Sequence, residues 1–83
     1  MTSQIRSIIA RTVELPAGID SLSDAADLYE AGMTSFGSVQ LMLALEEAFD
    51  VEFPERMLNR KLFSSVASIS AALDELVAER AES

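Results

Sequence analysis

Apolar residues in this chain return every three or four positions, and this spacing restricts the fold to packed helices. Residues with that spacing share one face of a helix, which is buried against a neighbouring element. The first such set is Ile5, Ile8, Ile9 and Val13. No segment shows the alternation of apolar and polar residues that is typical of a half-buried strand. The pattern therefore predicts an all-α protein, whose first helix ends before Pro16.

Further helices are expected in the second half of the chain. Residues 35 to about 50 are rich in strong helix formers and contain no proline. Their core stripe should consist of Leu41, Met42, Leu45 and Phe49. A short helix over 55–61 should follow Pro54. A last helix, capped by Ser64 or Ser65, should have an apolar seam of Val66, Ile69, Leu73, Leu76 and Val77.

The long connection over 15–34 and the C-terminal tail complete the expected fold. Small and polar residues fill much of the connection, which should contain a short helical turn and be held to the core by Leu22, Leu28 and Tyr29. The tail at 78–83 is polar and should fray. We therefore expect residues 1–83 to form one domain, a small four-helix bundle with three longer helices and one short helix.

The charge balance limits the partners of such a bundle. Six Lys plus Arg against fourteen Asp plus Glu give a formal net charge of −8. A negative surface repels nucleic acids and anionic membranes and attracts proteins with basic patches. No apolar run is long enough to span a bilayer or to act as a signal segment. We expect a cytoplasmic monomer that binds neither nucleic acid nor membrane.

The composition also excludes most catalytic chemistry. The chain contains no Cys and no His, so it lacks cysteine nucleophiles, Ser-His triads, zinc fingers and disulfides. The adjacent carboxylates of Glu46 and Glu47 point in different directions on a helix and have no base or metal cluster beside them. A calcium loop that begins at Asp20 would place Leu22 and Ala31 where oxygen ligands are required. We predict no catalytic residue, no metal site and no enzyme activity.

The predicted helix that starts near Ser35 has apolar residues on more than one flank. Phe36, Val39 and Leu43 follow i, i+3 and i+7 spacing, apart from the core stripe. They form either a widened core or an exposed strip for a protein partner. The polar residues beside this strip, which would belong to the same partner surface, are Thr34, Gln40, Glu46 and Glu47. Ser35 itself is either an ordinary helix cap or a hydroxyl open to modification at the positive end of the helix.

A family resemblance favours modification. The stretch 27–36, DLYEAGMTSF, resembles the signature region of acyl carrier proteins, and Ser35 falls on their modified serine. The similarity continues through Val39, Leu41, the Leu-Glu-Glu run at 45–47, Phe49, the Phe-Pro pair at 53–54 and the residues Phe63, Ser64, Ser65, Val66 and Ile69. Glycine, serine and helix pattern together are fairly specific, whereas G-x-x-S alone is not.

The resemblance implies a function and a cofactor. A phosphopantetheinyl transferase would attach the 4'-phosphopantetheine arm of coenzyme A to Ser35. The arm would hold acyl or aminoacyl groups as thioesters for a loading ligase or synthase with a basic docking patch. The alternative is an unmodified helical adaptor that binds a partner through Phe36, Val39 and Leu43, with Ser35 bare.

The chain departs from this family at the modified serine and in the third predicted helix. The family usually has Asp before the serine and Leu after it, where this chain has Thr34 and Phe36. Arg56, Arg60 and Lys61 stand where carriers of fatty-acid synthases tend to be acidic. These basic residues are either a solvated helix face or the mark of a specialised carrier, with the aminoacyl carrier proteins as a candidate subgroup.

Overall fold

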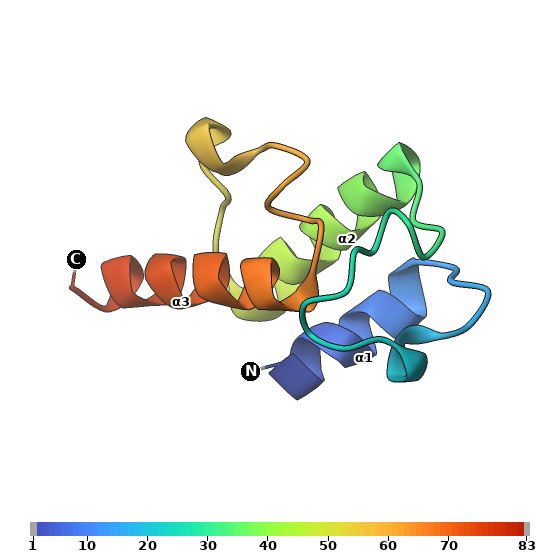
Figure 1. The fold of residues 1–83 in the computed structure, drawn as a ribbon. Coiled ribbons are helices and arrows are strands. Elements are labelled where there is room, and N and C mark those ends of the chain that lie inside the picture. The colour runs from blue at the N-terminus through green and yellow to red at the C-terminus, as the bar shows by residue number, and fades with distance from the viewer. Residues whose placement is uncertain (1, 83) are drawn as a thin grey trace.

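A computed structural model describes residues 2–82 of the chain and the side chains of residues 2–80. In chain order its helical elements are α1 (Thr2–Thr12), the 3-10 turn η1 (Ile19–Ser21), α2 (Ser35–Phe49), the 3-10 turn η2 (Glu55–Met57) and α3 (Val66–Glu82). Helix α1 packs against both α2 and α3, and the segment between α2 and α3 arches over them as a loop (Figure 1). No helix in this described range is long and apolar enough to cross a membrane.

The core contains most of the apolar side chains that the helical spacing predicts, but Val77, predicted in the seam of the last helix, is exposed, and Phe49 is only partly buried. The core side chains with almost no exposed surface are Ile5, Ile9, Leu28, Leu41, Leu45, Val66, Ile69 and Leu73. Burial of a side chain of this size contributes about 1.5–3 kcal/mol, so eight of them dominate the stability. Met33 and Met57 are also buried in this core, whereas Met42 is only partly buried.

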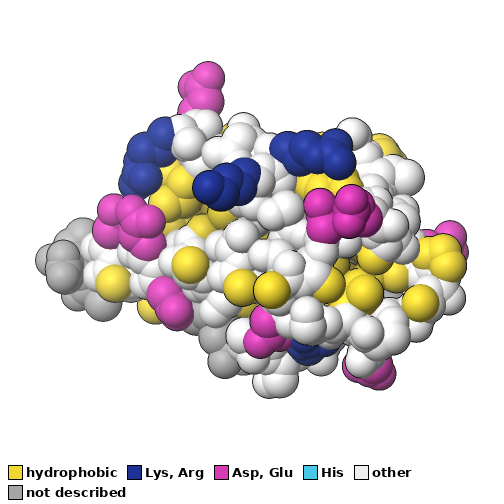
Figure 2. Space-filling model, in the orientation of Figure 1, with side chains coloured by type: hydrophobic (Ala, Val, Ile, Leu, Met, Phe, Trp, Pro, Cys, Tyr) yellow, Lys and Arg dark blue, Asp and Glu magenta, His cyan; other side chains and the backbone are white. Residues whose placement is uncertain are grey.

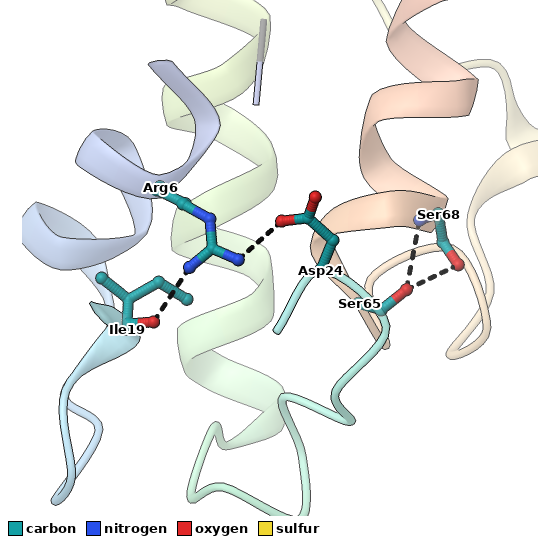
Figure 3. Close-up of polar contacts among 5 residues, drawn as sticks. All are labelled: Arg6, Ile19, Asp24, Ser65 and Ser68. Atoms are coloured by element: carbon teal, nitrogen blue, oxygen red, sulfur yellow. Dashed lines mark hydrogen bonds and ion pairs between the residues drawn. The ribbon is translucent and has the colours of Figure 1, made fainter. Parts of the chain in front are cut away.

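As predicted, the first connection contains a short helical turn, η1, and is held to the core by the buried Leu28 and the partly buried Leu22 and Tyr29. The backbone N–H of Leu28 donates to the carbonyl of Ser64 at 2.7 Å, and that of Ala67 donates to the carbonyl of Asp24 at 2.9 Å. Arg6 extends from α1 to the Ile19 carbonyl at 3.0 Å and to the Asp24 carboxylate at 2.6 Å (Figure 3). These contacts fix residues 19–28, which precede the turn into α2.

The end of the loop before α3 explains which serine caps that helix. The Ser65 hydroxyl accepts a hydrogen bond from the Ser68 backbone N–H at 3.1 Å and donates to the Ser68 hydroxyl at 3.0 Å (Figure 3). Ser64 instead donates its hydroxyl to the Lys61 carbonyl at 2.7 Å. Ser65 is therefore the N-cap of α3, one of the two candidates that the sequence offered.

The predicted short helix over 55–61 is wrong in extent, because residues 2–82 contain three α-helices and only a 3-10 turn at this place. The helical turn stops at Leu58, whose φ is −80° and ψ is 81°. The Asn59 side-chain oxygen then accepts a hydrogen bond from the Leu62 N–H at 2.9 Å. An asparagine that bonds the nearby backbone in this way competes with helix formation.

The predicted frayed tail at 78–83 is helical as far as Glu82, and Ser83 lies outside the described residues. Arg80 explains the extension of α3. Its guanidinium donates to the Asp50 carbonyl at 3.0 Å and pairs with the Asp50 carboxylate at 2.6 Å. These contacts tie the last turns of α3 to the C-terminal end of α2.

Candidate functional site at the start of α2

The first turn of α2 separates the capping residue from an exposed hydroxyl. Thr34 is the N-cap, with φ −91° and ψ 167°, and its Oγ1 accepts a hydrogen bond from the Gly37 N–H at 2.9 Å. Ser35 is the first residue of the helix and is exposed. No hydrogen bond joins its Oγ to any other described residue. Because Thr34 makes the cap, the interpretation of Ser35 as an ordinary capping residue is wrong.

The tight turn over residues 27–32 leads the chain to the position of Ser35. The Asp27 carboxylate accepts hydrogen bonds from the backbone N–H groups of Tyr29 at 2.9 Å and Glu30 at 3.3 Å. Gly32 follows with φ +123°, and a Cβ there would lie 2.9 Å from the Pro16 Cδ. Only glycine has both the freedom to adopt this φ and the small size that the contact requires. The signature stretch therefore has a structural basis up to the residue before the cap.

A hollow of ≈ 430 Å³ opens directly beside Ser35. One wall is α2 and the opposite wall is the loop that contains η2. Its lining residues are Tyr29, Ser35, Ser38, Val39, Met42, Leu58, Asn59, Arg60 and Phe63. The Arg60 guanidinium lies 4.2 Å from the centre of the Tyr29 ring. A flexible arm on Ser35 Oγ would thus have both solvent and a largely apolar hollow within reach, so the residues present fit a covalent tether.

The predicted apolar strip is exposed. Phe36, Val39 and Leu43 leave 72%, 50% and 55% of their surfaces accessible, so a widened core does not explain them. Thr34, Gln40 and Glu47 are exposed beside them. The strip runs along α2 from the turn that contains Ser35, and it has the apolar centre and polar edge of a docking surface.

The two adjacent glutamates have different roles. Glu46 is half-buried, and its Oε2 accepts a hydrogen bond from the Phe53 backbone N–H at 2.9 Å. This contact anchors the loop that follows α2. Glu47 is exposed and no hydrogen bond or ion pair joins its side chain to other described residues. The predicted partner surface therefore contains Glu47 as a free acidic group, whereas Glu46 has a structural contact.

The basic residues of the loop gather on one edge of the molecule, which Figure 2 shows as dark blue side chains above the apolar surface. Arg56 pairs with Glu75 at 3.6 Å and with Glu79 at 3.5 Å, both on α3. Lys61 is exposed. Arg60 instead belongs to the hollow beside Ser35. Nothing in the sequence distinguishes these three residues from one another, and the prediction did not place Tyr29, Asn59 or Phe63 at the site.

Comparison with known families identifies the family to which a chain with this site belongs. The sequence model described as "Phosphopantetheine attachment site" matches residues 3–73. The chain belongs to the phosphopantetheine attachment site family. It is a carrier protein of the kind that holds its cargo on phosphopantetheine, and it is not itself a catalyst.

Similar proteins indicate which subgroup of the family the chain resembles. The carrier is 55% identical to an aminoacyl carrier protein of Agrobacterium fabrum over 69 aligned residues. The aligned region covers 83% of each of the two chains. It also resembles a chain in the crystal structure of an engineered Bradyrhizobium japonicum glycine:[carrier protein] ligase complexed with a carrier protein from Agrobacterium tumefaciens and AMP. There the TM-score is 0.86 and the identity 51%, over 89% of this chain and 99% of that one.

More distant structures share the fold. One is a chain in the crystal structure of Bradyrhizobium japonicum glycine:[carrier protein] ligase complexed with glycylated carrier protein, with 27% identity, a TM-score of 0.73 and coverage of 86% of this chain and 95% of that one. A holo acyl carrier protein from Nitrosomonas europaea has 20% identity and a TM-score of 0.78, over 89% and 92% of the two chains. The all-α, acyl-carrier-like fold is thereby confirmed, whereas the predicted four-helix count is not, because the described range contains three α-helices and two 3-10 turns.

Proposed function

We propose that Ser35 is the residue that receives the phosphopantetheine arm and that the cargo is an aminoacyl group. The exposed Ser35 hydroxyl, next to a capped helix start and a hollow that fits an arm, is the observation that supports the attachment site. In the transfer, Ser35 Oγ forms a bond to the phosphorus of coenzyme A nearest the pantetheine. The pyrophosphate bond breaks, adenosine 3',5'-bisphosphate leaves, and the hydroxyl proton passes to a base of the transferase.

The residues of the chain position this chemistry but do not drive it. The Thr34 cap holds Ser35 at the positive end of α2, where a phosphodiester gains about 0.3–1 kcal/mol from the exposed backbone amides. That gain is too small to drive attachment, so a transferase is required. The bound arm supplies a thiol that forms a thioester with the cargo. Since the chain contains no cysteine, no side-chain thiol competes for the cargo.

Intact mass tests the attachment. The apo protein is incubated with coenzyme A and a broad-specificity phosphopantetheinyl transferase, and one phosphopantetheine per chain is expected. Ser35→Ala should gain nothing. Ser23→Ala, the same change at another exposed serine, should be modified as fully as the wild type. If no transferase modifies the wild type, the alternative of an unmodified adaptor gains support.

The aminoacyl cargo is supported by the relatives. The most informative are the aminoacyl carrier protein at 55% identity and the carrier chain that resembles this one in the glycine ligase complex. The holo protein is mixed with ATP, single amino acids and the Bradyrhizobium japonicum ligase, and its mass is measured before and after thioester cleavage by hydroxylamine. We expect a hydroxylamine-sensitive gain with a small amino acid. A gain only with fatty acids and an acyl ligase would contradict the aminoacyl assignment.

We propose that the exposed strip and its polar edge form the docking surface for these enzymes. Phe36, Val39 and Leu43 would fill an apolar groove, and Thr34, Gln40 and Glu47 would contact the rim, with Glu47 facing a basic patch. Glu46 contributes its charge to this surface while its side chain holds the Phe53 amide. The cytoplasmic location and the monomeric state stay predictions.

A further inference from the structure

The loop over residues 50–65, here called the η2 loop, contains three basic residues that line two different hollows. Arg56 and Lys61 line a shallow depression against α3, together with Ala71 and Glu75. Arg60 lines the other hollow, the one that contains Ser35. The positively charged side chain of Arg60 therefore lines the hollow of the proposed attachment site, although the net charge of the chain is −8. A solvated face explains Arg56 and Lys61, but it does not explain why Arg60 lines the hollow that contains Ser35.

The surroundings of the Arg60 guanidinium leave it able to bind an anion. Arg6, Arg56 and Arg80 each pair with a carboxylate, whereas Arg60, like Arg11 and Lys61, has no carboxylate of the described residues within ion-pair distance; among these three only Arg60 lines the hollow that contains Ser35. Its contact is the face of the Tyr29 ring, 4.2 Å away. Stacking holds the plane of a guanidinium and leaves its edge N–H donors available for an oxyanion. Tyr29 is itself held by the Asp27 turn, through its N–H at 2.9 Å.

We propose that Arg60 is a positioning residue that pairs with the phosphodiester of the phosphopantetheine arm. The inference rests on the proposed attachment to Ser35. The phosphodiester carries a full negative charge at neutral pH, and it would enter the hollow whose wall contains Arg60. Charge pairing of this kind directs the first part of the arm between α2 and the η2 loop. Because Arg60 is exposed, the pairing biases the position of the arm without locking it and weakens with salt.

Nuclear magnetic resonance of apo and holo protein tests the pairing. Attachment is first verified by mass. We expect the side-chain Nε–H signal of Arg60 to shift between apo and holo protein at low salt, while the Nε–H signal of Arg56 stays in place as an internal control. Sodium chloride should return the Arg60 signal towards its apo position. The phosphorus resonance of the arm should show the same salt dependence.

Variants separate charge from packing. Arg60→Gln keeps much of the stacking surface but removes the charge, and it should shift the phosphorus resonance to a value that no longer responds to salt. Arg60→Lys should retain part of the salt response, and Arg56→Gln should retain all of it. An Arg60 signal that is identical in apo and holo wild type would overturn the proposal, even if Arg60→Gln cannot be modified. Failure of Ser35 to gain the arm would instead overturn the proposed function.

Discussion

Thr34 and Ser35 are adjacent hydroxyl residues with different environments. Thr34 Oγ1 caps α2 through the Gly37 N–H, while Ser35 Oγ is exposed and makes no bond to the described residues. The residue that replaces the usual Asp of the family therefore performs a task that Asp also performs, since both side chains accept hydrogen bonds at a helix start. The substitution preserves the cap and removes one negative charge beside the modified serine.

Thr34→Ala should lower the free energy of unfolding by about 1 kcal/mol, because it removes the acceptor for the Gly37 N–H. Thr34→Asp should keep the cap and retain the wild-type stability to within about 0.5 kcal/mol. Urea denaturation monitored by circular dichroism measures both. An unchanged stability of Thr34→Ala would show that water replaces the cap at no cost.

Gly32→Ala should be among the most destabilising changes in the signature stretch. It forces an L residue to φ +123° and places a Cβ 2.9 Å from Pro16 Cδ, at an expected cost of about 1–3 kcal/mol. Gly18→Ala is the matched control, because its φ is also positive, +80°, but its Cβ would meet nothing within 4 Å. Urea midpoints should fall further for Gly32→Ala. Equal losses would contradict a role for the Pro16 contact.

At the scale of elements, α2 has three tasks on different sides: core packing, an exposed strip and an anchor for the following loop. The Glu46 contact with the Phe53 N–H is that anchor. Glu46→Ala should cost about 1–2 kcal/mol of unfolding free energy, because the Phe53 amide loses its acceptor. Glu47→Ala should change stability by less than about 0.5 kcal/mol. Thermal melts compare the two, and similar losses would mean that the anchor contributes nothing.

The helices that could be predicted are those whose residues set their own structure. The uninterrupted run that begins at Ser35 gives α2 to within a residue, and the spacing of Ile5, Ile8 and Ile9 gives α1, which ends at Thr12, ahead of the predicted stop at Pro16. The prediction for the segment after Pro54 was wrong, because the turn stops at Leu58 and the Asn59 side chain then bonds the Leu62 N–H in competition with a helix. Such competition between side chain and helix has no periodic signature.

The site was predictable in the same uneven way. Ser35 was found from the motif around it, and the exposed strip from a second helical stripe on α2. Arg60 and Phe63 were not placed beside Ser35, because they reach it only through the path of the loop after η2, and Tyr29 was not placed there because it reaches the site from the first connection, before α2. Spacing along the chain carries no information about that path. The signal in the sequence for Arg60 was its positive charge, at a place where carriers of fatty-acid synthases tend to be acidic.

At the scale of the whole molecule, charge sets how the carrier meets its enzymes. With a net charge of −8, association with a basic docking patch should be fast at low salt and slower as salt screens it. Glu47→Lys reverses one charge at the edge of the strip and should slow aminoacyl loading at least about twofold at low salt.

Asp74→Lys is the control for this prediction. It makes the same charge change at an exposed position of α3, so it alters the net charge without touching the strip. Initial loading rates over a salt series should separate the two variants at low salt and bring them together at high salt. Equal rates for both variants at low salt would assign the effect to net charge alone.

The location of the arm on the wild-type protein tests the central claim most directly. The holo protein is digested, and fragmentation of the modified peptide identifies the residue that carries the phosphopantetheine. The structure predicts a single modification on Ser35, whose hydroxyl is the exposed one in the first turn of α2. A phosphopantetheine on Thr34, Ser38 or any other hydroxyl would contradict the account.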